Sequence, residues 1–403
     1  MASSGVARGG AAGGGVVSGS AGLRIAVVLG TATGGTARHA GMLAEACRRA
    51  GLKVLAIGPT ATRAAFRAGA AAWTEGSAEA GVPFHPAEIS DRPRLGRDLA
   101  VLARLRRLLR QAGPDVVHAH GMRAGAFAAL ALLPGRRERA RPALVVTAHN
   151  APPAGRAGRA AFGMLEMICA RRADAVLCAS ADLADRMRRR GAAGVAEFDV
   201  PALPAIAPSA EAVARARQDI GAAGRPVVLA AGRLTPQKGF DTLLAAAAAW
   251  RDRNPPPRVA IAGTGPLAAE LTAAAGCSGA DLVLLGERDD VPALLAAADV
   301  VAVPSRWEAR ALIVQEALRA GARIVASRAG GTPGLTGPDA AILVPPQDAR
   351  ALGAAILAVL DDSGLAARLS AAARARAAEL PSAADAVTVV LTVYRQAGQR
   401  GGR

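Results

Sequence analysis

The sequence predicts an α/β protein with two domains, each built on a doubly wound parallel sheet. A chain of 403 residues is longer than a typical domain with a single hydrophobic core, and its length fits two domains of about 150 to 200 residues each. Short apolar runs alternate with helical patterns along the chain, which favours right-handed βαβ crossovers. Between 199 and 212 the alternation is interrupted by Pro201, Pro204 and Pro208, and then it resumes. Two similar domains facing across a cleft follow from this pattern.

The first domain is expected to span residues 23–200. Its first strand, 23–30, leads through a glycine-containing turn at 31–41 into a helix at 42–51. The same alternation predicts strands at 52–59, 115–120, 143–150 and 174–180, and helices at 97–112, from about 123, and up to about 172. Residues 1–22 are rich in Gly, Ala and Ser and lack a continuous apolar core, so we expect a disordered leader rather than a signal peptide.

The second domain is expected at 223–380, after an interdomain linker at 201–222. It has predicted strands at 226–232, 258–265, 281–287, 299–305, 322–327 and 340–346, and helices at 241–250, 291–298 and from about 311. The C-terminal segment 381–403 carries a last apolar helical pattern at 385–398 and a basic tail. Because this helix follows the final strand, it is free to pack on either domain.

The charge balance leaves two readings of the surface open. Lys and Arg exceed Asp and Glu by 49 − 32 = 17, and the excess lies mostly in Arg-rich stretches at 104–111, 136–141 and 186–191. These stretches are either solvated helix faces in a chain whose Ala and Arg bias is typical of a high-GC genome, or a basic rim on the first domain that attracts anionic lipid or a polyanionic acceptor. Nucleic acid is disfavoured as a partner because no aromatic residues are interleaved with the basic runs.

Composition also bears on the compartment. No apolar run reaches the roughly 18 residues that span a bilayer. The cysteines have no CxxC spacing and are expected to be reduced thiols, mostly buried, rather than disulfides or metal ligands; they are Cys47, Cys169, Cys178 and Cys277. We therefore expect a cytoplasmic protein, with peripheral contact at the inner membrane face left open.

Chemistry-bearing residues follow several strands of the first domain. Ligands of parallel α/β sheets bind beyond the carboxyl ends of strands, where helix amino ends present N–H groups. Those ends carry Gly34, Gly35, His118, His120, His149 and Ser180. A single His at a strand end is usually structural, but two strands that each bring His to one edge favour a functional site.

The strand ends of the second domain indicate an anion site. Arg233 and Lys238 lie five residues apart in a loop bounded by Gly and Pro. Two cations with nearby glycines suit a diphosphate, because Arg gives bidentate contacts and Lys a mobile charge. The segment "GTGPLA" lacks the third glycine of a dinucleotide fingerprint, and no GxxxxGK[ST] pattern occurs.

Glu308 and Glu316 are eight residues apart at the start of a predicted helix that places Leu312, Glu316 and Ala320 on one stripe. Eight helical residues rise about 12 Å. This length matches a hexose and a ribose held on either side of a diphosphate at the helix amino end, so the spacing fits a nucleotide sugar.

With these features, the chain resembles a retaining glycosyltransferase of family 4, a family with the GT-B fold of two Rossmann-like domains. The resemblance covers about 23 to 395. It is carried by "GGTARH" (34–39), "DVVHAHG" (115–121), "VVTAHN" (145–150), "ADAVLCAS" (173–180), "GRLTPQKGFDTLL" (232–244), the E-x7-E pair at Glu308 and Glu316, and "AGGTPGL" (329–335).

The resemblance implies transfer of a sugar from a nucleoside diphosphate sugar to an acceptor, with retention of configuration and with no metal or other cofactor required. By position, Arg233 and Lys238 would bind the diphosphate, Glu316 the ribose and Glu308 the transferred sugar. Gly35 would allow the backbone to approach the leaving phosphate, and His120 would lie near the anomeric centre. The acceptor, a sugar or a lipid-linked, envelope or natural-product molecule, would lie against the first domain. The resemblance also implies that the C-terminal helix of 381–403 crosses back onto the first domain.

The chain departs from the family between the two glutamates, where Ala309, Arg310 and Ala311 replace the usual Gly-Phe-Gly. Arg310 is a candidate for an added phosphate contact or an altered donor choice, and Leu312 is a further donor-site candidate. Two alternatives stay open: a non-catalytic or weakly active nucleotide-sugar-binding protein, and a sugar-nucleotide epimerase.

Overall fold

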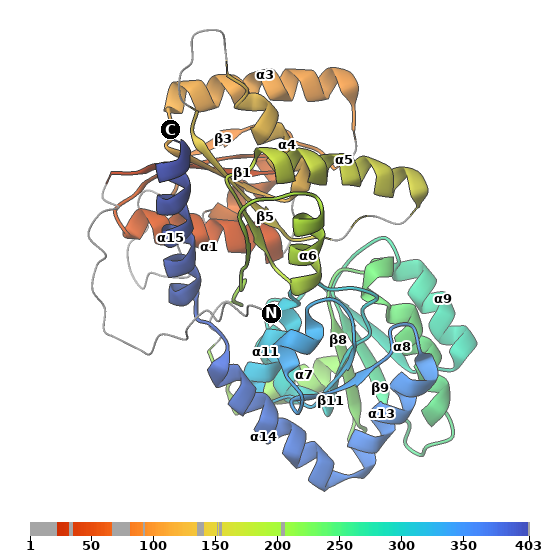
Figure 1. Cartoon of the computed structure of the whole chain (residues 1–403). Coiled ribbons are helices and arrows are strands. Elements are labelled where there is room, and N and C mark those ends of the chain that lie inside the picture. The colour runs from red at the N-terminus through yellow and green to blue at the C-terminus, as the bar shows by residue number, and fades with distance from the viewer. Residues whose placement is uncertain are drawn as a thin grey trace, which may run out of the picture.

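The computed structural model describes residues 22–31, 35–66, 81–91, 93–134, 141–150, 152, 155–202 and 206–401. Apart from Gly22, the expected leader lies outside these ranges, as does most of the Arg-rich stretch 136–141. Figure 1 shows two α/β units, one above the other, with a sheet at the centre of each. The prediction of two doubly wound parallel-sheet domains is confirmed.

Among the described residues, the first sheet has seven strands in the order β3-β2-β1-β4-β5-β6-β7, and every pairing between them is parallel. The strand bounds are β1 Arg24–Leu29, β2 Lys53–Gly58, β3 Phe84–Pro86, β4 Val116–His120, β5 Ala143–Ala148, β6 Ala175–Cys178 and β7 Val195–Glu197. The order reverses between β1 and β4. Such a switch point leaves a crevice beyond the strand ends, because the helices that follow the two strands lie on opposite faces of the sheet.

The helices of this domain are α1 Gly35–Arg49, α3 Leu95–Ala112, α4 Met122–Ala131, α5 Arg156–Arg172 and α6 Ala181–Arg189, with the 3₁₀ turn η1 Thr60–Thr62. The prediction of a turn at 31–41 is wrong in its second half, because α1 begins at Gly35. Glycine disfavours helices intrinsically, but burial of Ala37, Ala40 and Leu43 against the sheet outweighs this local preference.

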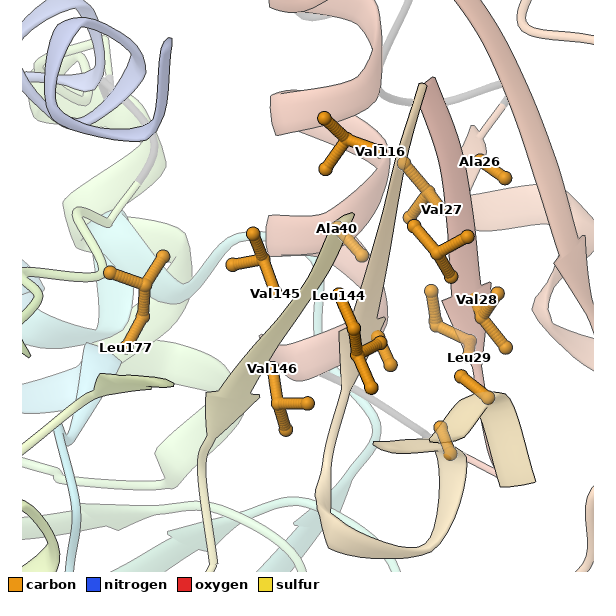
Figure 2. Close-up of a cluster of buried hydrophobic side chains, with 14 of the residues drawn as sticks. Ala26, Val27, Val28, Leu29, Ala40, Val116, Leu144, Val145, Val146 and Leu177 are labelled. Carbon is orange, nitrogen blue, oxygen red and sulfur yellow. The ribbon is translucent and has the colours of Figure 1, made fainter. Parts of the chain in front are cut away.

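The strands at the centre of the first sheet are apolar along their whole length because both faces are covered. Val27 of β1, Val116 of β4 and Val145 of β5 are at most 1% exposed, and Figure 2 shows them projecting from neighbouring strands. Continuous rather than alternating apolar runs are typical of such parallel sheets.

The second sheet has the order β10-β9-β8-β11-β12-β13, again all parallel, with the switch point between β8 and β11. Its strands are β8 Val227–Ala231, β9 Arg258–Ala262, β10 Leu282–Gly286, β11 Val300–Val303, β12 Ile324–Ser327 and β13 Ala341–Val344. Its helices are α7 Ala210–Ile220, η2 Pro236–Lys238, α8 Phe240–Ala246, η3 Ala247–Trp250, α9 Ala268–Ser278, α10 Val291–Ala297, α11 Leu312–Ala320, α12 Thr332–Thr336, α13 Ala349–Asp361 and α14 Ser363–Glu379.

The range expected to be a linker, 201–222, contains α7. Ala216 and Ile220 of this helix are buried in the second core, beside α10. Ser209 caps the helix by accepting a hydrogen bond from the Ala212 N–H. The second half of the range therefore forms part of the second domain.

The last helix, α15 (Ala383–Gly401), returns to the first domain. It packs against β5, β4 and α1, and Figure 1 shows it beside the upper unit. Val390, Tyr394 and Ala397 are at most 2% exposed within the first core. The chain thus passes between the domains twice.

Two further expectations concern thiols and membranes. The four cysteines are free; Cys47, Cys169 and Cys178 are buried and Cys277 is exposed. Burial raises the pKa of the Cys47 thiol to about 12. Within the described ranges, no helix combines the length and apolar character that crossing a bilayer requires.

Candidate functional site

The candidate residues gather at the two switch points, which face each other between the domains. Gly35 begins the helix after β1, and His120 ends β4. In the second domain, Lys238 follows β8 and Glu308 follows β11. The segments that follow β1 and β11 adjoin each other, since a Cβ at Gly35 would lie 2.6 Å from Leu312 Cδ1.

The loop after β8 brings Lys238 back toward the sheet. Lys238 ends the short η2 turn, and Gly239 then adopts φ +65°. A Cβ at Gly239 would lie 2.1 Å from the Pro304 carbonyl oxygen, so glycine is required for the loop to approach the end of β11 this closely. Arg233, in the same loop, is exposed.

Glu308 is held by two donors. Its Oε1 accepts hydrogen bonds from Lys238 Nζ at 2.6 Å and from Ser305 Oγ at 2.7 Å. The residue is 6% exposed. Its backbone is fixed by the glycine loop after β12, where the Gly331 N–H donates to the Glu308 carbonyl at 2.8 Å. Gly330, at φ +53°, has no room for a side chain, since a Cβ would lie 1.9 Å from that carbonyl oxygen.

Trp307 connects this loop to both domains. Its carbonyl accepts a hydrogen bond from Gln237 Nε2 at 2.9 Å. Its indole Nε1 donates to Asp182 Oδ2 at 2.8 Å, and the other oxygen of Asp182 accepts from the Ser180 hydroxyl. Asp182 lies in the first turn of α6, so the loop that carries Glu308 is anchored to the first domain.

The amino ends of α1 and α11 meet at the contact between the two domains. A methyl group at Gly35 would lie 2.6 Å from Leu312 Cδ1. No side chain of the described residues caps α11 at Ala311, and an uncapped helix amino end is a favourable place for an anion.

Glu316 lies in the second turn of α11 and is half-buried. Burial raises the pKa of its carboxyl group above the usual range, and the positive charges of Arg38 and Arg319 act in the opposite sense. Arg38 belongs to α1, so Glu316 faces a cation of the first domain.

Arg310 pairs with Asp199, just beyond β7. Burial lowers the pKa of this guanidinium, and Asp199 partly offsets the effect. Its charge therefore bridges the domains in this structure rather than standing open to a phosphate.

Four histidines form a buried cluster at the end of β4. His120 Nδ1 lies 3.2 Å from His149 Nε2, and the rings of His118 and His120 stack with centroids 4.3 Å apart. His39 of α1 meets the rings of His120 and His149 edge-on, at 5.8 and 5.9 Å. Burial lowers the pKa of each, to about 3 for His118 and about 4 for His149, so all are neutral at pH 7.

The cluster contains ring nitrogens without a protein partner. His118 is satisfied, because Nδ1 bonds the Tyr394 hydroxyl at 2.7 Å and Nε2 bonds Thr147 Oγ1 at 2.6 Å. In contrast, His120 Nε2 and both nitrogens of His39 are buried with no hydrogen-bond partner among the described residues. Unsatisfied buried polar atoms are rare in proteins, so these nitrogens are available to a bound molecule. No group of three or more His, Cys, Asp or Glu side chains in the described ranges is arranged to hold a metal ion.

The structure thus brings predicted residues together in three pairs. Lys238 contacts Glu308, Gly35 contacts Leu312, and His120 contacts His149. Sequence reasoning missed His39, Trp307, Asp182 and Tyr394 as parts of the site. Trp307 and Tyr394 are notable as aromatic residues in a chain with only 2% aromatics, but their partners are distant in sequence.

Comparisons with known proteins agree with this architecture. The family model "Glycosyltransferase Family 4" matches residues 33–196, and the model "Glycosyl transferases group 1" matches residues 225–362. Each model covers one of the two domains, and together they cover both sides of the site.

Two curated relatives match part of the chain. A GDP-mannose-dependent phosphatidylinositol monomannoside mannosyltransferase of Mycolicibacterium smegmatis is 37% identical over 139 residues, 32% of this chain and 36% of that protein. A D-inositol 3-phosphate glycosyltransferase of Salinispora arenicola is 34% identical over 210 residues, 48% of this chain and 46% of that protein. The matched regions thus span between about a third and a half of these relatives.

Solved structures match over nearly the whole chain. HepE of Anabaena, crystallised with UDP and glucose, has a TM-score of 0.75 at 20% identity and covers 92% of this chain and 99% of its own. Sucrose-phosphate synthase of Thermosynechococcus elongatus has a TM-score of 0.72 at 23% identity and covers 93% of this chain and 98% of its own. These likenesses concern the fold. The chain belongs to the family 4 glycosyltransferases and has the GT-B fold.

Proposed function

We propose that this protein transfers a sugar from a nucleoside diphosphate sugar to an acceptor, with retention of anomeric configuration and without a required metal. The observation that carries the proposal is the Lys238–Glu308 pair, which lies at the switch point beside the open amino end of α11. A cation and a carboxylate placed there match the diphosphate and the sugar of such a donor.

The pair suggests how the donor is received. Without a donor, Lys238 and Glu308 satisfy each other at 2.6 Å. A bound donor would take over both partners, with the diphosphate contacting Lys238 and Arg233 and the sugar hydroxyls contacting Glu308. Glu316 would accept from the ribose hydroxyls, and Gly35 and Leu312 would border the phosphates where α1 meets α11.

The proposed chemistry needs no carboxylate base. The bond between the anomeric carbon and the phosphate oxygen breaks, and the acceptor oxygen bonds to the same face of that carbon. The acceptor proton passes to the leaving phosphate. Arg233 and Lys238 stabilise the negative charge that develops on the phosphate, and His120 contacts the sugar or phosphate through its unpartnered Nε2.

The acceptor is proposed to lie against the first domain, as a sugar or a lipid-linked, envelope or natural-product molecule. The names of the mannosyl- and inositol-directed relatives support this range. We propose a cytoplasmic location, with contact to the inner membrane face through the basic first domain.

A second candidate function is nucleotide-sugar binding without efficient transfer. It is favoured by Ala309-Arg310-Ala311, because Ala309 and Ala311 are 7% and 3% exposed and Arg310 is engaged by Asp199. An epimerase is the weaker alternative, since the cationic loop and the paired glutamates match the transferase pattern.

A thermal-shift panel of UDP, GDP, ADP and their sugars tests the donor site. A ligand at 100 times its Kd should stabilise the protein by about 2.7 kcal/mol, and Lys238→Ala should abolish the shift. If no nucleotide shifts the melting temperature, the proposed donor site is wrong. NMR of the products then separates the functions: transfer or hydrolysis with retained configuration supports the transferase, a changed sugar stereochemistry in the nucleotide product supports the epimerase, and binding alone supports the non-catalytic protein. Activity that survives EDTA supports metal independence.

A further inference from the structure

We propose that Tyr394 of the C-terminal helix is a positioning residue for His120, acting through His118. The inference rests on the proposed function in one respect, namely that His120 contacts the donor. Its structural part concerns only the described residues: the hydroxyl of Tyr394 orients one imidazole, and that imidazole orients the next.

The first step is the hydrogen bond between Tyr394 and His118. The two residues are 276 positions apart, and both are fully buried, with the Tyr394 hydroxyl 2.7 Å from His118 Nδ1. Burial raises the pKa of the phenol well above its usual value, so Tyr394 keeps its proton and can donate.

The second step is the choice of tautomer. A neutral imidazole offers one donor and one acceptor, and His118 faces a hydroxyl at each nitrogen. A phenol is more acidic than an aliphatic alcohol, so it is the stronger donor and the weaker acceptor. Tyr394 therefore donates to Nδ1, and His118 Nε2–H donates to Thr147 Oγ1. The ring is held at both ends, in one tautomer and one plane.

The third step is the effect of the oriented His118 ring on the orientation of His120. Side chains two residues apart on a strand lie on the same face, and the His118 and His120 rings stack at 4.3 Å with an interplanar angle of 30°. On its other side His120 bonds His149, whose ring is inclined by 15°. The orientation of the His120 ring is thus fixed by stacking on His118 and by the hydrogen bond with His149, so its unpartnered Nε2 points in a defined direction. Without the Tyr394 hydroxyl, His118 would lose one of its two hydrogen bonds, and the orientation of the His120 ring stacked on it would be less well defined.

Selective ¹⁵N labelling of histidine tests the structural part. The chain has five histidines, and His85, which is exposed on β3, serves as an internal reference. In Tyr394→Phe, the His118 Nδ1 resonance should move in the direction of a lost hydrogen bond, and the His120 resonances should move with it. Val390→Ala is the matched control, because Val390 is equally buried on α15 but has no polar group; it should lower stability without these shifts.

Unchanged His118 resonances in Tyr394→Phe would overturn the hydrogen-bond assignment. A response of His118 without one of His120 would overturn the positioning role. Both results are independent of catalysis.

Hydrolysis of UDP-glucose and of GDP-mannose, assayed separately, tests the functional part. Because small misplacements of a group at the reacting centre act on the chemical step, Tyr394→Phe should lower kcat about tenfold with KM within about twofold, while Val390→Ala should leave both within about twofold. An equal fall of kcat in the two variants would reduce Tyr394 to a packing residue. If the wild type hydrolyses neither donor, that result counts against the proposed function, and the NMR measurement alone decides the positioning role.

Discussion

Lys238 Nζ lies 2.6 Å from Glu308 Oε1, with side-chain exposures of 20% and 8%. Each of these two charges is largely shielded from water and is stabilised by the other, because removal of one would leave the other desolvated and unpaired.

Lys238→Ala should therefore lower the free energy of unfolding by about 1–3 kcal/mol. In Lys238→Ala/Glu308→Ala, the loss of unfolding free energy should be smaller than the sum of the losses in the two single variants. Urea denaturation checks both. The matched control is Arg306→Ala, which breaks a pair with Asp241 exposed at 38% and 53% and should cost less than about 1 kcal/mol. Additive losses at Lys238 and Glu308 would contradict the coupling.

Glu316→Gln should stabilise the free protein at neutral pH and weaken binding of whichever nucleotide the thermal-shift panel identifies. Burial raises the pKa of the carboxyl group, so its charged form is disfavoured by folding and is lost as the pH falls toward that raised pKa. The wild-type affinity for that nucleotide should fall on acidification. The variant should bind it about tenfold more weakly at neutral pH, which corresponds to the loss of one charged hydrogen bond, and its affinity should depend less on pH. Calorimetry from pH 5 to 8 measures both, and parallel pH profiles would rule out this role.

The histidine cluster should make the protein acid-sensitive. The native pKa is about 3 for His118 and about 4 for His149, below the ordinary 6.5. The unfolded chain thus binds more protons between about pH 6.5 and 4, and the stability present above 6.5 is lost as the pH falls, at up to about 1.4 kcal/mol per pH unit for each histidine. His118→Gln should flatten the dependence of the melting temperature on pH, while His85→Gln should not. An identical slope in all three proteins would contradict this.

Trp307→Phe should loosen the contact between the domains, because it removes the donor to Asp182 at 2.8 Å. We expect the affinity for the nucleotide sugar to fall about five- to tenfold, corresponding to a lost hydrogen bond to a charged group, and the radius of gyration in solution scattering to rise. Asp185→Ala is the control on the same helix, since among the described residues Asp185 forms its ion pair within α6, with Arg188. Equal effects of the two variants would show that this contact does not hold the domains together.

Gly35→Ala should impair nucleotide-sugar binding through Leu312. The new methyl group would lie 2.6 Å from Leu312 Cδ1, so α1 and α11 would be forced apart where the phosphates are proposed to bind. Gly35→Ala/Leu312→Ala should regain affinity in the thermal-shift assay. Failure of the double variant to recover would show that Gly35 acts through its backbone rather than through space for Leu312.

The main strands could be predicted because parallel strands covered on both faces are continuous apolar runs. β3 and β7 could not, since each is a three-residue edge strand with an exposed residue, His85 and Glu197 respectively. The preceding prolines prevented the prediction of α7, and a glycine prevented the prediction of the start of α1. In both places burial of the helix stabilises it more than the local residue preferences disfavour it.

The site was predictable where its residues share one loop or helix, as with Arg233 and Lys238 or Glu308 and Glu316. The roles assigned to them stay predictions. The contacts of Tyr394 with His118 and of Trp307 with Asp182 join segments 276 and 125 residues apart. No local pattern encodes such pairs, since they depend on how the domains and α15 dock.

The return of α15 to the first domain has a mechanical consequence. Two covalent connections, one before α7 and one at Leu380–Ala383, join the same two domains, so a change in the position of one domain relative to the other must leave both connections intact. A fragment cut at residue 200 would lack Val390, Tyr394 and Ala397 from its own core and would not be a complete folding unit.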